Sequence, residues 1–254
     1  MRKAILLAVA AAALAVSAPA YASTSLSGWW PLYEDSGTTA HDTSGNRDNG
    51  MLSGNVNWTS GYFGSGLSFD GSTGEVDVPD AAALEPSTSV SVGAYVKASG
   101  TPGAFKYIVA KGADACFASS YALYTGANSG LEFYISQNGG LTYTISPDAG
   151  AGLWNGQWHF VVGTYDGHAV HLYVDGKQVG SGTPATGPIG YGLANGNDLF
   201  FGHYDGCDGL DFSGSIDEPT VWNQALNPQQ VSTAHTLLTM LHGFVSRLPS
   251  FPGT

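Results

Sequence analysis

The sequence predicts an all-β protein, a β-sandwich or barrel followed by a short C-terminal helix. Three observations lead to this fold class. Segments that alternate apolar and polar residues recur along the chain, as at Val90–Val96 and Val170–Val174. Clusters of Gly, Asn, Asp and Ser separate them, and a helical pattern follows only near the C-terminus. Alternation gives each strand one buried face, and many short strands with turns between them are typical of a sandwich or barrel.

The first 22 residues have the features of an export signal. Arg2 and Lys3 precede a continuous apolar run, which ends before the small-x-small pattern Ala20-Tyr21-Ala22. The run is shorter than the roughly 20 residues that a membrane-spanning helix needs. We therefore expect cleavage after Ala22, no membrane span and a secreted, extracellular, monomeric protein. Residues 23–228 are expected to form one domain, and residues 229–254 a C-terminal helix and tail.

The charge balance excludes some partners. Without the signal, six Lys and Arg remain against 20 Asp and Glu, a formal net charge of −14. Nucleic acids and anionic membranes require positive charge on the protein, so neither is expected as a partner. The balance is compatible with neutral glycans and with cations. The two cysteines, Cys116 and Cys207, are expected to form a disulfide because the chain is exported.

The strands are expected in order at segments with period-two alternation. The alternating apolar residues are Val76 and Val78; Val90, Val92, Ala94 and Val96; Leu131, Phe133 and Ile135; Leu141, Tyr143 and Ile145; and Val170, Leu172 and Val174. Asp166-Gly167 and Asp175-Gly176 predict tight turns in which both residues have positive φ, so Phe160–Val179 is expected to be a β-meander.

A helix is expected from Asn227-Pro228 onward. Asn is a favoured N-cap and Pro is favoured at the first helical position. One face carries apolar residues at helical spacing, namely Val231, Ala234, Leu238 and Leu241. We expect this face to dock on the sandwich and the helix to end at Gly243 or in the region of Pro249 and Pro252.

Several phrases along the chain have the order and spacing of one family of domains. The most specific phrase is Gln157–Gly167, QWHFVVGTYDG, continued by VHLYVDG at Val170–Gly176. The other phrases are DTSGN at 42–46, FGSGLSFDG at 63–71, VSVGAYV at 90–96, GSIDE at 214–218 and WNQAL at 222–226. Together they resemble the laminin-G-like (concanavalin A-like) jelly-roll domains of exported bacterial proteins. The resemblance implies an antiparallel two-sheet β-sandwich with sheets of six or seven strands, in which the first and last strands are adjacent. Pro219 stands where the family has Val, and it predicts a bulge or an edge there.

The resemblance also implies a structural calcium ion. In the family, the N-terminal loop and the Ile-Asp-Glu strand meet, and calcium is often bound between them. By position, the ligands would be Asp42, Asn46, Asp217 and backbone oxygens near Gly50. Oxygen ligands of this kind suit Ca²⁺. The alternative is that Asp42 and Asn46 cap a turn through the backbone.

A ligand site is expected in the loops after residue 190. Sugar sites combine an aromatic platform with amide and carboxylate groups. The candidate residues are Tyr191, Asn195, Asp198, His203, Tyr204 and Asp205. The acidic loop of Asp205, Asp208 and Asp211 around Cys207 is expected either to hold a cation or sugar or to be a solvated loop.

The resemblance implies a binding module for carbohydrate or a surface glycoconjugate, with no catalytic residues. Two alternatives remain open. A protein-binding adhesion or scaffold domain is one. The other is a glycoside hydrolase or polysaccharide lyase of the same fold. Glu75, Asp77 and Asp80 resemble the acidic strand of retaining glycosidases, and Gln157-Trp158-His159 resembles a phrase of alginate lyases.

Overall fold

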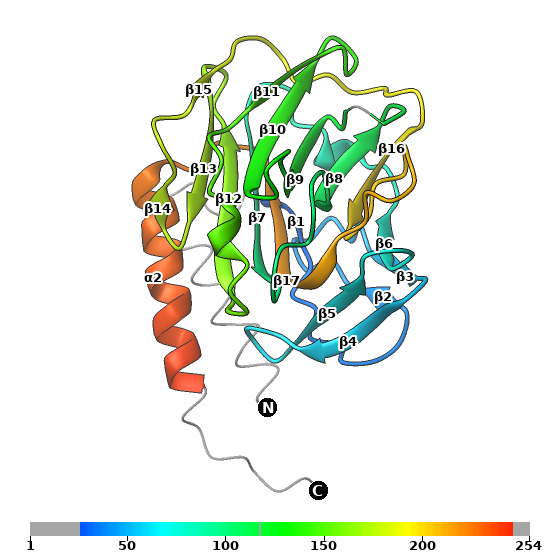
Figure 1. Ribbon diagram of the computed structural model, residues 1–254, viewed down its shortest axis with the longest axis vertical. Helices are drawn as coiled ribbons and strands as arrows, with labels where there is room; N and C mark the ends of the chain where they lie inside the picture. Colours follow the sequence, from blue (N-terminus) through cyan, green and yellow to red (C-terminus); the bar gives the residue numbers. More distant parts are fainter. Residues whose placement is uncertain (1–25, 117, 246–254) are drawn as a thin grey trace, which may run out of the picture.

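The described part of the chain folds into two antiparallel sheets that pack face to face, with a long helix on the outside (Figure 1). A computed structural model describes residues 26–116 and 118–245. The predicted fold class is therefore confirmed. The expected signal at 1–22 and the tail after 245 lie outside the described residues.

The larger sheet has nine strands, and β7 and β17 are at its centre. Its main path runs β14-β13-β12-β7-β17-β5-β4, with β1 beside β17 and β15 beside β13. The strands are β1 (Leu26–Trp29), β4 (Val56–Ser60), β5 (Ser65–Asp70), β7 (Val90–Lys97), β12 (His159–Tyr165), β13 (Ala169–Val174), β14 (Lys177–Gln178), β15 (Thr183–Pro184) and β17 (Ser213–Trp222). The first and last strands, β1 and β17, pair as the resemblance implied.

The second sheet has eight strands in the order β11-β10-β9-β8-β16-β6-β3-β2. They are β2 (Thr39–Ala40), β3 (Gly50–Ser53), β6 (Glu75–Val78), β8 (Tyr107–Ala113), β9 (Tyr121–Thr125), β10 (Leu131–Gln137), β11 (Thr142–Ile145) and β16 (Gly196–Phe201). Single 3₁₀ turns lie at Ala82–Leu84 and Ala151–Leu153. Both sheets exceed the expected six or seven strands, partly because two-residue strands such as β2 and β14 extend their edges.

The main core lies between the sheets. It is made of the inward-facing residues of each strand, for example Val92 of β7, Phe133 of β10 and Ile216 of β17. Gly163 of β12 lies directly over the Phe133 ring, since a Cβ at this position would come within 2.0 Å of it. At Val76–Val78, Val90–Val96, Leu131–Ile135 and Val170–Val174 the alternation thus corresponds to burial between two layers. The prediction for the set at 141–145 is wrong in part, because Leu141 and Tyr143 are 83% and 52% exposed.

The β12–β13–β14 meander is confirmed, with one difference in turn geometry. Asp175 and Gly176 both have positive φ, 49° and 76°, as predicted for this two-residue turn. At the other turn Gly167 has positive φ, whereas Asp166 does not. Asp166 instead accepts hydrogen bonds from the N–H groups of His168 and Ala169, so its side chain closes a longer loop.

Pro219 coincides with an irregularity in the centre of the larger sheet. The pairing of β17 with β7 shifts register between Asp217 and Thr220, and Glu218 has a φ of 54°. The sequence predicted a bulge or an edge at Pro219, and the structure has the bulge. The consequence is that two consecutive acidic side chains, Asp217 and Glu218, both enter the protein interior.

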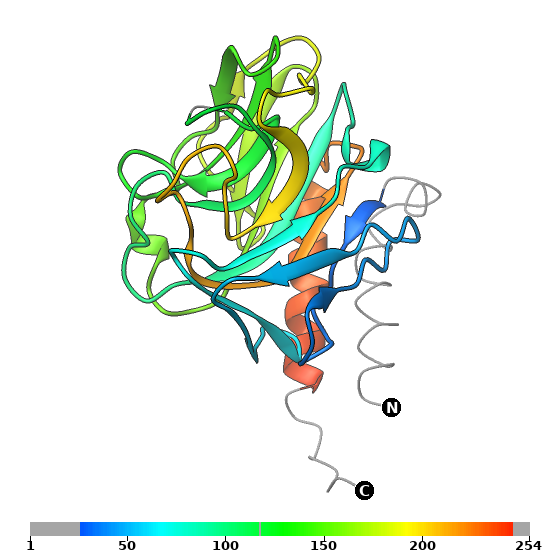
Figure 2. The same ribbon diagram turned by 90° about the vertical axis from the view of Figure 1, so that its right-hand side faces the viewer.

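The C-terminal helix, α2 (Pro228–Val245), covers the outer face of the nine-stranded sheet (Figure 2). Asn227 caps it: its carboxamide accepts the Gln230 N–H, and the Gln230 side chain accepts the Asn227 N–H. The four predicted apolar residues, Val231, Ala234, Leu238 and Leu241, are all buried against the sheet. The helix continues through Gly243 to Val245. Within residues 26–116 and 118–245, no helix has the length and apolarity that a membrane crossing requires.

Candidate functional site

Asp42, the first predicted calcium ligand, is buried and fully hydrogen-bonded. Its Oδ1 accepts the backbone N–H groups of Trp29 (3.0 Å) and Ser44 (2.8 Å). Its Oδ2 accepts the Ser44 hydroxyl (2.8 Å) and the Asp48 N–H (3.0 Å). The carboxylate thus ties the loop to β1, which is the turn-capping alternative that the sequence left open.

The other predicted ligands have separate partners. The Asn46 amide donates to the Ser27 carbonyl at 2.7 Å, and Gly50 pairs with Ala40 in the second sheet. Asp217 accepts the N–H groups of Phe63 (2.9 Å) and Glu218 (2.9 Å). The described part of the chain contains no cluster of three or more His, Cys, Asp or Glu side chains placed to hold a metal ion. In this arrangement the residues fit a hydrogen-bonded turn, and calcium binding stays a prediction.

Asp217 and Glu218 form a buried acidic pair beneath α2. Glu218 accepts hydrogen bonds from the Trp29 indole N–H and the Tyr33 hydroxyl. Burial raises the pKa of both carboxyls, and the charge of Glu218 raises that of Asp217 further. The hydrogen bonds from Tyr33 and Trp29 favour the charged form of Glu218 and partly offset the effect of burial, so the pKa of Glu218 is raised to about 7.

The predicted disulfide between Cys116 and Cys207 is confirmed, with Cα atoms 5.0 Å apart. It ties the loop after β8 to the loop after β16. The loop after β16 lies over the outer face of the eight-stranded sheet, where Cys207 and Leu210 contact a buried cluster that includes Tyr107 and Tyr134.

Two of the predicted ligand-binding residues are not available for stacking. Tyr204 is 1% exposed and its ring stacks on Tyr107 at 4.3 Å, so its prediction as an exposed platform is wrong. Its hydroxyl hydrogen-bonds to backbone carbonyls of the loop after β8, and burial raises its pKa to about 12. Tyr191 is half-buried against the main core and donates its hydroxyl to the Pro86 carbonyl. The sequence did not predict these contacts, because both tyrosines lie in loops and their partners are far away in the chain.

The remaining predicted ligand-binding residues do not form one pocket. Asn195 is exposed and accepts the Ala115 N–H, whereas Asp198 accepts the Asp80 N–H at 2.7 Å. Asp205 is exposed. The two ring nitrogens of His203 lie beside the carboxylates of Glu75 and Asp211, in an acidic cluster formed by β6, β16 and the loop after β16.

This acidic cluster contains part of the glycosidase-like phrase. Glu75 and Asp77 share the outer face of β6, as alternation predicted. The His203 ring lies 3.3 Å from the Glu75 carboxylate and 2.6 Å from that of Asp211. Burial, followed by the charges of Asp198 and Glu75, raises the pKa of Asp77 to about 6.

The other residues of the enzyme-like phrases have structural partners. The Asp80 carboxylate accepts a hydrogen bond from the buried ammonium of Lys111. His159 lies 2.8 Å from the Asp175 carboxylate and 3.2 Å from the Asn155 side chain, within the β12–β13 region.

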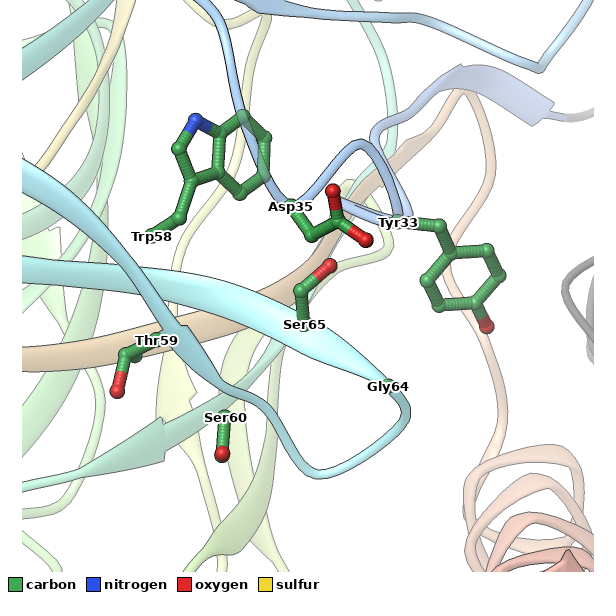
Figure 3. Close-up of a pocket in the computed structure, with 7 residues that line it drawn as sticks. All are labelled: Tyr33, Asp35, Trp58, Thr59, Ser60, Gly64 and Ser65. Atoms are coloured by element: carbon green, nitrogen blue, oxygen red, sulfur yellow. The ribbon is translucent and has the colours of Figure 1, made fainter. Parts of the chain in front are cut away.

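A pocket of about 320 Å³ lies between β4, the start of β5 and the segment after β1, and we call it the Trp58 pocket. Its lining residues are Tyr33, Asp35, Trp58, Thr59, Ser60, Gly64 and Ser65. Figure 3 shows the Asp35 carboxylate between the rings of Trp58 and Tyr33, with the Ser65 hydroxyl directed toward it. The pocket therefore presents aromatic surface beside a carboxylate and hydroxyl groups.

The walls of the Trp58 pocket are fixed by hydrogen bonds. The Trp58 indole N–H donates to the Gly37 carbonyl at 2.8 Å, and the Ser65 hydroxyl donates to the Leu32 carbonyl at 2.6 Å. Tyr33 is held by Glu218, and burial raises its pKa far above the usual value, so it stays a neutral phenol. Sequence reasoning missed this site. Its available signal was a Trp among the polar residues Asn57, Thr59 and Ser60.

A second pocket, of about 300 Å³, lies beside the disulfide on the outer face of the eight-stranded sheet. We call it the tyrosine pocket. It is lined by Phe105, Tyr107, Cys116, Tyr124, Tyr134, Tyr143, Ile145, Cys207 and Leu210. Phe105 and Tyr143, which are 47% and 52% exposed, are at its rim.

Solved structures share this fold at low sequence identity. Domain 4 of AbnA, a GH43 extracellular arabinanase from Geobacillus stearothermophilus solved in complex with arabinotriose, has a TM-score of 0.63 and 18% identity over 84% of this chain and 99% of that chain. The binding domain of Paraclostridial Mosquitocidal Protein 1 has a TM-score of 0.66 and 13% identity over 83% of this chain and 52% of that chain. Trypanosoma rangeli sialidase has a TM-score of 0.56 and 18% identity, and it matches 82% of this chain but 32% of its own. At these identities the similarity shows the fold alone. The similar structures include both enzymes and binding domains.

No curated protein matches the chain in sequence. A family profile described as the concanavalin A-like lectin/glucanases superfamily matches residues 70–232, more than half of the chain. The match spans β6 to the first turn of α2, and the two-sheet architecture agrees with it. The chain therefore belongs to the concanavalin A-like lectin/glucanase superfamily.

Proposed function

We propose that the protein is a secreted binding module that recognises carbohydrate in the Trp58 pocket. The observation that carries the proposal is the placement of the Asp35 carboxylate and the Ser65 hydroxyl beside the Trp58 ring (Figure 3). A sugar presents C–H groups on one face and hydroxyls around its edge. An aromatic face with hydrogen-bonding groups beside it complements both features.

The rigidity of the pocket supports binding. Trp58 and Ser65 are each held by a hydrogen bond to the backbone, and the Tyr33 hydroxyl is held by Glu218. Walls that are already ordered lose little conformational entropy when a ligand binds. The pocket volume also lies within the range of small-molecule sites, roughly 300–1,000 Å³.

The charge of the protein selects among carbohydrates. With Asp35 in the pocket and an acidic chain around it, the site disfavours uronates and sulfated glycans by repulsion. The ligand expected is a neutral sugar. The arabinanase domain was solved with arabinotriose, so arabino-oligosaccharides are the first probes we would use.

A glycan array with the purified protein tests the proposal. The wild type is expected to bind neutral glycans, and Trp58→Ala is expected to lose about 2 kcal/mol, roughly 30-fold in affinity, as buried Trp contacts do at binding sites. Trp158→Ala is the matched control, because Trp158 is half-buried under Lys97 directly before β12, which is separated from β4 by three strands of the same sheet. Binding that is absent on the array, or equal in all three proteins, contradicts the proposal. If no glycan binds, the protein-binding scaffold becomes the leading function, whereas equal binding by all three proteins would mean that the carbohydrate site lies outside the Trp58 pocket.

Hydrolysis is the second candidate function, and the Glu75–His203–Asp211 cluster favours it. A carboxyl with a pKa near 6, such as Asp77, is suited to general acid catalysis near neutral pH. The release of reducing ends from a panel of neutral polysaccharides would support this function if Glu75→Gln abolished the activity. No release from the panel would argue against it.

We also propose the predicted calcium ion as a structural ligand of the Asp42 loop. Binding would require the Asp42 carboxylate to exchange hydrogen bonds with Trp29, Ser44 or Asp48 for contacts with the metal. The role of such an ion would be to stabilise the loop against β1.

A further inference from the structure

We propose that the tyrosine pocket binds a quaternary ammonium group of the choline type. This site is separate from the Trp58 pocket, and none of its lining residues belongs to that pocket. The inference stands on ring geometry, on the use of the tyrosine hydroxyls and on charge.

The rings of the pocket face one another at steep angles. Tyr124 and Tyr134 are 4.9 Å apart at 87°, Tyr107 and Tyr134 are 6.4 Å apart at 84°, and Tyr134 and Tyr143 are 6.1 Å apart at 58°. These are edge-to-face or tilted contacts between neighbouring rings, and all four rings also line the pocket, so aromatic surface borders it on several sides. A methylated ammonium is attracted to such faces by the ring quadrupole, and it can contact several rings at once.

The hydroxyls of the buried tyrosines are already engaged, which disfavours a sugar here. The Tyr107 and Tyr134 hydroxyls lie 3.1 Å apart, and Tyr134 also accepts the Ser119 N–H at 2.7 Å. The Tyr124 hydroxyl donates to Glu132 at 2.7 Å. The pocket consequently offers mainly ring surface, together with Ile145, Leu210 and the disulfide sulfur atoms.

The charges around the tyrosine pocket favour a cationic ligand over a neutral apolar one. The half-buried Glu132 carboxylate lies at the hydroxyl of Tyr124, one wall of the pocket. The described residues that line the pocket include no Lys, Arg or His. The neighbouring Lys106 directs its ammonium to the Gly209 carbonyl. A cation in the pocket would therefore have aromatic faces around it and a carboxylate nearby.

Isothermal titration of the oxidised protein with choline and with its neutral isostere, 3,3-dimethyl-1-butanol, separates charge from shape. The wild type is expected to bind choline at least tenfold more tightly than the isostere. Tyr143→Ala is expected to weaken choline binding at least fivefold, whereas Tyr143→Phe retains it because the ring face remains. Leu141→Ala is the surface control, since Leu141 is 83% exposed near the same hairpin and does not line the pocket.

Glu132→Gln tests the electrostatic part, because it keeps an acceptor for Tyr124 and removes the charge. It is expected to weaken choline binding severalfold without changing the weak binding of the isostere. Equal affinity for the two probes, or no detectable choline binding, overturns the proposal. Tyr143 is 52% exposed, so its substitution is expected to leave the fold intact, and the comparison of the two probes on the wild type needs no variant.

Discussion

Removal of the Cys116–Cys207 disulfide is expected to destabilise the protein mainly through the unfolded chain. The two cysteines are 91 residues apart in sequence. In the loop-entropy model, a crosslink of this span restricts the unfolded chain by about 4–5 kcal/mol. Cys116 is exposed and Cys207 is only half-buried, so the double variant Cys116→Ala/Cys207→Ala creates little cavity in the folded state. Nearly the whole loss is therefore expected to come from loop closure.

The assay is equilibrium unfolding in urea, compared between the wild type and the double variant. We expect a loss of about 4 kcal/mol in the free energy of unfolding, which corresponds to a melting temperature lower by roughly 8–16 °C for a domain of this size. The wild type measured in a reductant should match the double variant. A loss below about 1 kcal/mol would refute the reasoning, because it would mean that the crosslink restricts the unfolded chain very little.

Three further predictions concern α2, the buried acidic pair and calcium. Val231→Ala is expected to cost about 2 kcal/mol by urea unfolding, because Val231 is fully buried against the sheet, whereas Met240→Ala, at a position 67% exposed, is expected to cost almost nothing. Burial raises the pKa of Glu218 from 4.5 to about 7, so the folded protein binds this proton more tightly than the unfolded chain between those values. The free energy of unfolding should therefore fall as the pH rises from 4.5 to 7, and Glu218→Gln should make this pH dependence shallower. An unchanged pH dependence in the variant would contradict the raised pKa of Glu218. If the Asp42 loop binds calcium, chelation lowers the melting temperature and added calcium restores it, and a constant melting temperature excludes the ion.

Local sequence patterns predicted much of the fold because they report interactions close in the chain. The Asp175-Gly176 turn follows from the need for two positive φ angles, and the α2 start follows from the Asn227 cap. Burial of Val231 and its helical partners follows from their spacing. Asp166 shows the limit of this reasoning, because its side chain offered the backbone a second way to close the turn.

The candidate sites were harder to predict because they join segments far apart in sequence. The sequence suggested that Tyr204 is an exposed loop residue, but its ring is buried and stacks on Tyr107 of β8, which is far away in the chain. The Trp58 pocket needs Asp35 from one loop and Ser65 from the next hairpin, and no local pattern links them. Asp42 illustrates a different limit, since one carboxylate can cap a turn or bind calcium, and the sequence is compatible with both.

A crystal structure of the protein soaked with a neutral oligosaccharide that it binds on the array tests the central claim most directly. The account predicts a sugar ring over the Trp58 face, with hydroxyls within hydrogen-bond distance of the Asp35 carboxylate. A sugar bound at another surface, with the Trp58 pocket empty, would contradict the account.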